Sequence, residues 1–348
     1  MNTILDKQEE LMKTYSCYEA PLSLHGLNHI QPGTEEYWRL PLDILKQMPQ
    51  YEQLGRRPGG GRLRFRTDAS KFIVRYTLKT ESVDRCIPLP GSAGVDVYVG
   101  SGMESRYAGY VAPAEYGFKD TLIEGTIDKN PVMETVTINL PRNEQLSHLE
   151  IEVEDDAHVE AAQPYTIPSP IVFYGSSITE GGCADRPGTA YTSIVSRWLD
   201  AEYFNYGFSG SARGESVFAE FIAAHPAISA FVYDYDHNAP TPEHLEQTHR
   251  PFFEVVRKAH PSIPILLLTR PDFDRNPEDS NRRRAVVNDT YLTAVHGGDR
   301  HVYFIDGQSF FGSIGREECT VDGCHPNSLG FMRMAERVYP LLRKIIAK

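Results

Sequence analysis

The sequence predicts two differently built parts: an all-β first half, then an α/β second half around about five parallel strands. In the first half, apolar and polar residues alternate, which is typical of half-buried antiparallel strands. In the second half, short apolar runs alternate with longer helical stretches, which indicates βαβ units around a parallel sheet. Three prolines mark a linker at 164–170, so we place the two domains at residues 1–165 and 166–348.

The first half contains several short strand-like segments separated by turn residues. The alternation is clearest at 72–78, 95–99, 136–140 and 149–153. Proline and glycine residues punctuate the intervals at 58–61, 88–91 and 129–131. Several short strands with such punctuation predict a β-sandwich or jelly roll.

The second half reads as alternating strands and helices. We expect strands at 171–174, 203–206, 230–235, 263–269 and 302–306, and helices at 189–200, 215–225, 242–260, 281–296 and 328–347. Because parallel strands present their carboxyl ends at one edge, the loops that follow these strands should lie together, where open α/β sheets bind ligands.

Composition excludes several classes of partner. The 348 residues carry a formal net charge of −12 without a basic stripe, and we interpret the run Arg282–Arg284 as a solvated helix face, so we expect no nucleic-acid partner. No apolar run approaches a bilayer span, and residues 1–13 lack a secretory signal pattern. Five scattered cysteines without a Cys-x-x-Cys pair argue against disulfides or structural zinc, which fits a cytoplasmic location. We make no prediction of oligomeric state.

A serine pair follows the first strand of the second half. The run 171–174 stops at Gly175, and Ser176 and Ser177 come next. A hydroxyl at the carboxyl end of a buried parallel strand can serve as a nucleophile. The alternative is that these serines only cap the following helix.

A carboxylate and an imidazole lie close together near the other end of the chain. Asp322 and His325 precede the last helix, and Pro326 disfavours a helical conformation for His325. They should therefore lie in the loop after the last strand, at the same edge as Ser177. A carboxylate beside an imidazole can fix its tautomer and stabilise the imidazolium. A plain charged pair remains possible, as does a metal site with Cys324, although no further ligand has suitable spacing.

Two further loops follow strands at this edge. Gly207–Ser211 contains glycines that leave backbone N–H groups unobstructed, and Asn238 in 236–240 offers a side-chain N–H donor. Either loop alone is an ordinary turn. Together with Ser177 and His325 they indicate donors for an oxyanion.

These four blocks resemble those of the SGNH superfamily of GDSL-type esterases. Ser177 matches the nucleophile of the Gly-Asp-Ser block, Gly210 the oxyanion glycine, Asn238 the asparagine, and Asp322–His325 the Asp-x-x-His block. The resemblance covers residues 170 to 348 and implies a three-layer α/β/α, flavodoxin-like domain. The preceding β-rich half is similar to the jelly roll of two-domain bacterial carbohydrate esterases.

Three positions depart from the family pattern. Ser176 replaces the aspartate before the nucleophile, Ala239 replaces the aspartate after the asparagine, and the glycine of the third block is missing. Those positions usually tie loops together through hydrogen bonds, so the departures concern loop geometry more than chemistry.

The resemblance implies acyl transfer in two steps. Ser177 would attack an ester while His325 accepts its proton and Asp322 orients the imidazole; the N–H groups of Ser177 and Gly210 and the side chain of Asn238 would form the oxyanion hole. The implied substrates are small esters, above all acetyl groups on oligosaccharides, with no metal or organic cofactor. The alternatives are an acyltransferase using the same serine and a non-catalytic carbohydrate-binding protein.

Overall fold

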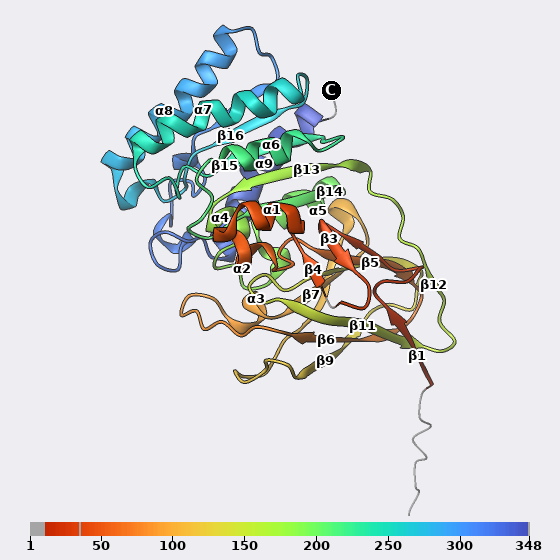
Figure 1. The fold of residues 1–348 in the computed structure, drawn as a ribbon. Coiled ribbons are helices and arrows are strands. Elements are labelled where there is room, and N and C mark those ends of the chain that lie inside the picture. The colour runs from red at the N-terminus through yellow and green to blue at the C-terminus, as the bar shows by residue number, and fades with distance from the viewer. Residues whose placement is uncertain (1–10, 35, 347–348) are drawn as a thin grey trace, which may run out of the picture.

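The computed structural model describes residues 11–34 and 36–346, and it shows two large antiparallel sheets and a two-stranded one beside a parallel sheet covered by helices (Figure 1). The antiparallel sheets lie at the bottom of the view in Figure 1, and the helices α7 (Pro242–Ala259) and α8 (Pro277–His296) lie at the top. Residues 1–10, on which most of the signal-peptide argument rests, and Ala347, the expected end of the last helix, lie outside the described residues.

The antiparallel part consists of two facing sheets. One has the order β1-β11-β6-β9, and the other has the order β12-β5-β10-β7-β8 with β2 paired to β5. The strands are β1 (Met12–Ser16), β2 (Ser23–His25), β5 (Arg62–Thr67), β6 (Lys71–Leu78), β7 (Val95–Val99), β8 (Arg106–Val111), β9 (Leu122–Asp128), β10 (Glu134–Asn139), β11 (Leu146–Glu154) and β12 (Val159–Glu160).

One apolar core joins these two sheets. Val74, Tyr76 and Ile151 come from the first sheet, Val97 and Ile138 from the second, and all are fully buried in one cluster. The four strands predicted from alternating residues correspond to β6, β7, β10 and β11. An antiparallel β-rich first half is therefore confirmed, while the jelly-roll connectivity stays a prediction.

The parallel sheet has five strands in the order β14-β13-β15-β16-β17, and every adjacent pair is parallel. The strands are β13 (Ile167–Gly175), β14 (Ala201–Gly207), β15 (Ala230–Asp234), β16 (Ile265–Leu268) and β17 (Val302–Ile305). The predicted α/β fold with about five parallel strands is thus confirmed. The strand order places β13, which carries the serine pair at its end, between β14 and β15.

Helices cover both faces of the parallel sheet because its strands are apolar on both sides. Along β13, Val172 and Tyr174 pack in the core under α6, α7 and α8, whereas Ile171 and Phe173 pack under α5 and α9. The helices of this part are α4 (Ser177–Glu180), α5 (Tyr191–Leu199), α6 (Ser216–Ala223), α7, α8 and α9 (Ser328–Ile346). Within the described range, none of the helices is long and apolar enough to cross a membrane.

A segment of the first half packs largely on the α/β core, although Tyr37 within it belongs to the core of the antiparallel sheets. It contains β3 (His29–Gln31), β4 (Glu36–Trp38), α1 (Leu42–Gln47) and α2 (Glu52–Gly55). Its side chains Leu40, Leu45 and Tyr51 are buried in the same cluster as residues of β13, β15 and α7. Figure 1 shows α1 and α2 between the two antiparallel sheets and the parallel one. The packing therefore crosses residue 165, and the proposed domain boundary stays a prediction.

Candidate active site

The two serines after β13 have different environments. Ser176 is the N-cap of α4: its Oγ accepts a hydrogen bond from the N–H of Ile178 at 3.1 Å. Ser177 is the first residue of α4, and its Oγ lies 2.9 Å from Nε2 of His325. The capping interpretation therefore fits Ser176, and the nucleophile interpretation fits Ser177, whose hydroxyl is placed for proton transfer to an imidazole.

His325 lies in the loop before α9, and each of its ring nitrogens has a partner. Nδ1 lies 2.8 Å from Oδ2 of Asp322, and Nε2 faces Ser177. Oδ1 of Asp322 accepts the backbone N–H groups of Cys324 at 3.0 Å and of His325 at 2.8 Å. Because the carboxylate is held by the backbone of its own turn, the imidazole has a fixed orientation toward Ser177.

The neighbours of His325 favour its protonated form. Its contact with Cys324 and its hydrogen bond to Asp322 outweigh burial and raise the pKa of His325 to about 9, with Cys324 the largest cause. Burial raises the pKa of Asp322, but the hydrogen bonds from His325 lower it to about 2, so this group is a carboxylate at neutral pH. For Cys324, hydrogen bonds to His237 and His325 outweigh burial and lower the pKa to about 7.

The predicted oxyanion donors lie around the same cavity. Gly210 has a φ of +66°, a conformation that favours glycine, and within the described residues its N–H makes no hydrogen bond. Asn238 donates one side-chain N–H to the carbonyl of Phe208 at 2.8 Å, which orients the amide and leaves its second N–H for another acceptor. The structure thus brings Ser177, Gly210, Asn238 and His325 together on one cavity.

A buried ion pair braces the loop that carries Gly210. Glu180 in α4 pairs with Arg39 at 2.9 Å, and both side chains are fully buried. The second oxygen of Glu180 accepts the N–H and Oγ of Ser209, while Arg39 donates to the carbonyl of Gly207 at 2.8 Å. Sequence reasoning missed this brace, although a charged residue three positions after the serine was a usable signal. It offers a physical reason why the loop holds its place without the aspartate that Ser176 replaces.

The Asn238 loop is held by Arg283, which corrects one expectation. We interpreted Arg282–Arg284 as a solvated face, but the Arg283 side chain is only 6% exposed and pairs with Asp279 at 2.7 Å. Its Nη1 donates to the carbonyls of Asp236 and Ala239, on both sides of Asn238. The error arose because three adjacent residues of a helix point in different directions, so one member can face the protein.

The cavity at this edge has a volume of about 500 Å³. Besides the groups above, the loop Asp84–Ile87 from the first half contributes Asp84, Cys86 and Ile87 to its wall, together with Cys183 and His237. Sequence reasoning assigned no role to the 84–87 loop, because nothing in the local pattern indicates that it reaches across to the second half.

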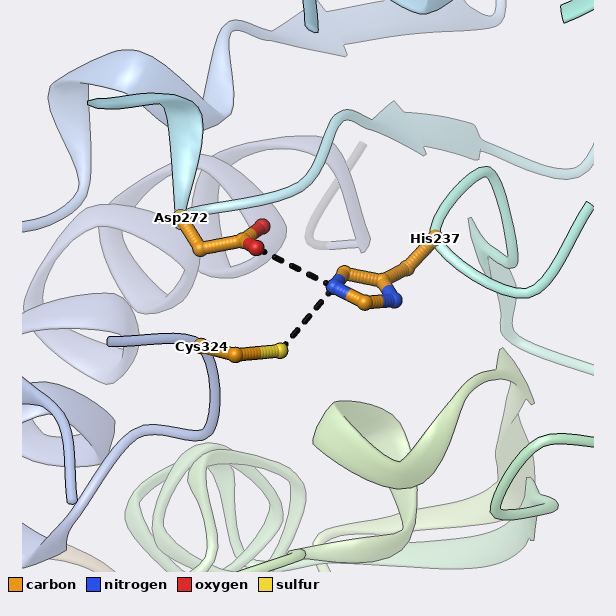
Figure 2. A group of neighbouring side chains, drawn as sticks. All are labelled: His237, Asp272 and Cys324. Carbon is orange, nitrogen blue, oxygen red and sulfur yellow. Dashed lines mark hydrogen bonds and ion pairs between the residues drawn. The ribbon is translucent and has the colours of Figure 1, made fainter. Parts of the chain in front are cut away.

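A second imidazole adjoins the cavity. Nε2 of His237 lies 3.1 Å from Sγ of Cys324 and 3.2 Å from Oδ2 of Asp272, and Figure 2 shows both contacts meeting at one ring nitrogen. The side chains of His237, Asp272 and Cys324 each offer one atom that could bind a metal ion, and these atoms all lie within 4.8 Å of one another. The same holds for Asp322, Cys324 and His325.

Two family models match this chain. A model of the GDSL-like Lipase/Acylhydrolase family matches residues 168–343, and a model of the N-terminus of SGNH-hydrolase-type esterases matches residues 15–159. None of the curated proteins searched matches the chain.

Solved structures share the fold over nearly the whole chain. A candidate GDSL-like lipase from Bacteroides ovatus is 26% identical with a TM-score of 0.84, covering 97% of this chain and 98% of its own. A salicylyl-acyltransferase from a tetracycline biosynthetic pathway is 21% identical with a TM-score of 0.79, covering 97% and 99%. A family two carbohydrate esterase from Clostridium thermocellum in complex with cellohexaose is 14% identical with a TM-score of 0.57, covering 83% and 93%.

Because the family model spans half of the sequence and includes both the serine block and the histidine block, the chain belongs to the GDSL-like Lipase/Acylhydrolase family.

Proposed function

We propose that this protein is a serine esterase that hydrolyses small acyl esters through an acyl-enzyme on Ser177. The observation that carries the proposal is the chain of contacts from Ser177 Oγ to His325 Nε2 at 2.9 Å and from His325 Nδ1 to Asp322 Oδ2 at 2.8 Å. A nucleophile, a base and a group that orients the base are the parts that serine acyl transfer needs.

In the proposed reaction, Ser177 Oγ attacks the ester carbonyl and His325 Nε2 accepts the hydroxyl proton. The negative charge that forms on the carbonyl oxygen is met by the N–H groups of Ser177 and Gly210 and by the free N–H of Asn238. His325 then returns the proton to the departing alkoxide, which leaves as an alcohol. In the second half of the reaction, water loses a proton to His325 and attacks the acyl-enzyme; the bond from the acyl carbon to Ser177 Oγ breaks, His325 returns the proton to Oγ, and the acid is released.

For the substrate, we propose acetyl esters of carbohydrates. A cavity of about 500 Å³ suits a small acyl group with part of a sugar, and its wall carries the polar side chains Asp84, Ser209 and Asn238 beside the candidate catalytic groups. The fold shared with a carbohydrate esterase solved with cellohexaose is consistent with such a substrate.

An acyltransferase is the second candidate, because the structurally similar salicylyl-acyltransferase aligns over 97% of this chain. The two activities share the acyl-enzyme and differ only in whether water or an acceptor alcohol attacks it.

The test is a mass-spectrometric screen of acetylated oligosaccharides from several polysaccharides, run with the wild type and with Ser177→Ala. We expect deacetylated products that require Ser177. Adding an excess of acceptor alcohol distinguishes the two activities: a hydrolase continues to release acetate, whereas a transferase forms the new ester at the expense of free acid. Activity that persists in Ser177→Ala would remove the proposal, and a preference for bulky aromatic acyl donors would remove the acetyl assignment.

A further inference from the structure

We propose that His237, Asp272 and Cys324 form a binding site for a single thiophilic divalent cation, with Zn²⁺ the ion that the site suits best. The three residues come from different parts of the second half: the loop after β15, the loop after β16 and the loop before α9 (Figure 2). His237 and Asp272 take no part in the candidate catalytic contacts, whereas Cys324 also interacts with His325.

The first argument is that the three side chains converge. Asp272 Oδ2 and Cys324 Sγ approach the same nitrogen of His237, at 3.2 and 3.1 Å. A ring nitrogen carries at most one proton, so it cannot donate a full hydrogen bond to two acceptors. A cation at the common point would bind all three atoms at once.

The distances fit tetrahedral zinc. Zinc bonds of about 2.0 Å to nitrogen or oxygen and about 2.3 Å to sulfur place neighbouring ligand atoms roughly 3.3–3.6 Å apart. The observed contacts are only slightly shorter, so small side-chain movements would open the site. Three protein ligands leave a fourth position for water.

The second argument is burial. Asp272 is 4% exposed and Cys324 1% exposed, so their polar atoms are shielded from bulk water. Within the described residues, Asp272 Oδ1 accepts no hydrogen bond, although Arg270 Nε lies 3.3 Å away. Arg270 is shared between Asp272 and Asp279, which its Nη1 contacts at 2.8 Å, and Asp279 also pairs with Arg283 at 2.7 Å. A buried carboxylate oxygen that accepts no hydrogen bond is expected where a cation can bind.

The third argument is access and ligand type. His237 faces the active-site cavity, and Asp272 lines a second cavity of about 480 Å³ with Thr320 and Gly323. The cluster therefore lies between two openings through which an ion can enter.

Sulfur and imidazole ligands select zinc or cobalt over magnesium and calcium, which prefer oxygen.

Cobalt is the probe for the test, because Co²⁺ occupies zinc sites and reports sulfur ligation through a sulfur-to-cobalt charge-transfer band. The full-length protein, reduced and stripped with a chelator, is titrated with CoCl₂ and then with ZnCl₂. We expect one equivalent of Co²⁺ to produce the band and the visible spectrum of four-coordinate cobalt, and Zn²⁺ to displace it. Zn²⁺ should also raise the Tm of the wild type.

Variants locate the site. Cys324→Ser should lose the charge-transfer band, and His237→Gln and Asp272→Asn should each weaken binding by roughly tenfold or more. Two controls should keep the band: Cys183→Ser, which removes another buried thiol on the cavity wall, and Asp322→Asn, which removes the carboxylate of the neighbouring group. Circular dichroism checks that each variant is folded, and Asp272→Asn keeps the shape of the side chain.

Absence of the band in the wild type would overturn the proposal. So would a band that survives in both His237→Gln and Asp272→Asn but is lost in Asp322→Asn, because the cation would then use Asp322 and His325 instead. These outcomes are read from spectra and not from turnover, so they do not depend on the proposed esterase activity.

Discussion

Two histidines at this edge of the sheet have nearly the same neighbours but different geometry. His325 and His237 each contact a carboxylate, and Cys324 interacts with both. His325 uses one nitrogen for Asp322 and the other for Ser177, whereas His237 turns a single nitrogen toward both Asp272 and Cys324. A general base needs one nitrogen facing the nucleophile while the other is held by an orienting group, so we propose His325, and not His237, as the general base.

The largest expected effect on kcat comes from removing the Ser177 hydroxyl, which His325 contacts and His237 does not. Ser177→Ala should lower kcat on the order of 10⁴-fold or more, because no nucleophile remains, as measured with p-nitrophenyl acetate. The matched control is Ser176→Ala, which removes a helix cap. It should cost about 1 kcal/mol of stability while the rate stays within roughly tenfold. Equal losses of rate in the two variants would remove Ser177 from the nucleophile role.

The two carboxylates give the next largest contrast. Asp322→Asn should lower kcat on the order of 10³-fold or more, because the amide no longer orients and stabilises the imidazolium of His325. Asp272→Asn makes the same change to the carboxylate partner of His237, and it should lower kcat far less than Asp322→Asn does. The measurement is kcat for both variants in metal-free buffer, and a larger loss in Asp272→Asn would reverse the assignment of the two histidines.

An oxyanion donor should contribute less than the nucleophile or the orienting carboxylate. Asn238→Ala should lower kcat by roughly 10²–10³-fold with little change in KM, because the lost hydrogen bond forms mainly in the transition state. Since Asn238 also bonds to Phe208, the Tm of the variant must be compared with that of the wild type. A loss confined to KM would place Asn238 in ground-state binding.

The smallest effect concerns pH. His325 can accept a proton only when it is neutral, so kcat/KM should rise with pH and level off above its pKa of about 9. Cys324 is the largest cause of that raised pKa, so Cys324→Ser should move the rise to lower pH and increase kcat/KM at pH 7 by roughly tenfold. A pH profile that is identical in the two proteins would show that Cys324 does not act on His325.

The elements that sequence predicted well are those with a repeating pattern or a short motif. The five parallel strands are buried on both faces, so they appear in the sequence as short apolar runs. The strands β6, β7, β10 and β11 appear as alternating apolar and polar residues, which is typical of burial on one face. The contact of Ser177 with His325 across 148 positions could be anticipated, because the carboxyl ends of parallel strands share one edge.

What sequence could not predict depends on long-range packing. Arg39 reaches Glu180 from a segment that carries no motif, and Arg283 turns inward from a run of three arginines. The meeting of His237, Asp272 and Cys324 requires three loops to be placed in space, and their spacing along the chain matches no metal motif.

The Arg39–Glu180 ion pair has a consequence for dividing the protein. A fragment starting at residue 166 would keep Glu180 but lose Arg39, which also donates to the carbonyl of Gly207, so the loop that carries Gly210 would lose one of its supports. It would also uncover the apolar surface that Leu40, Leu45 and Tyr51 occupy. We therefore expect the half that contains Ser177 to be unstable on its own, and an engineer who wants a minimal enzyme should retain residues 38–55 as part of it.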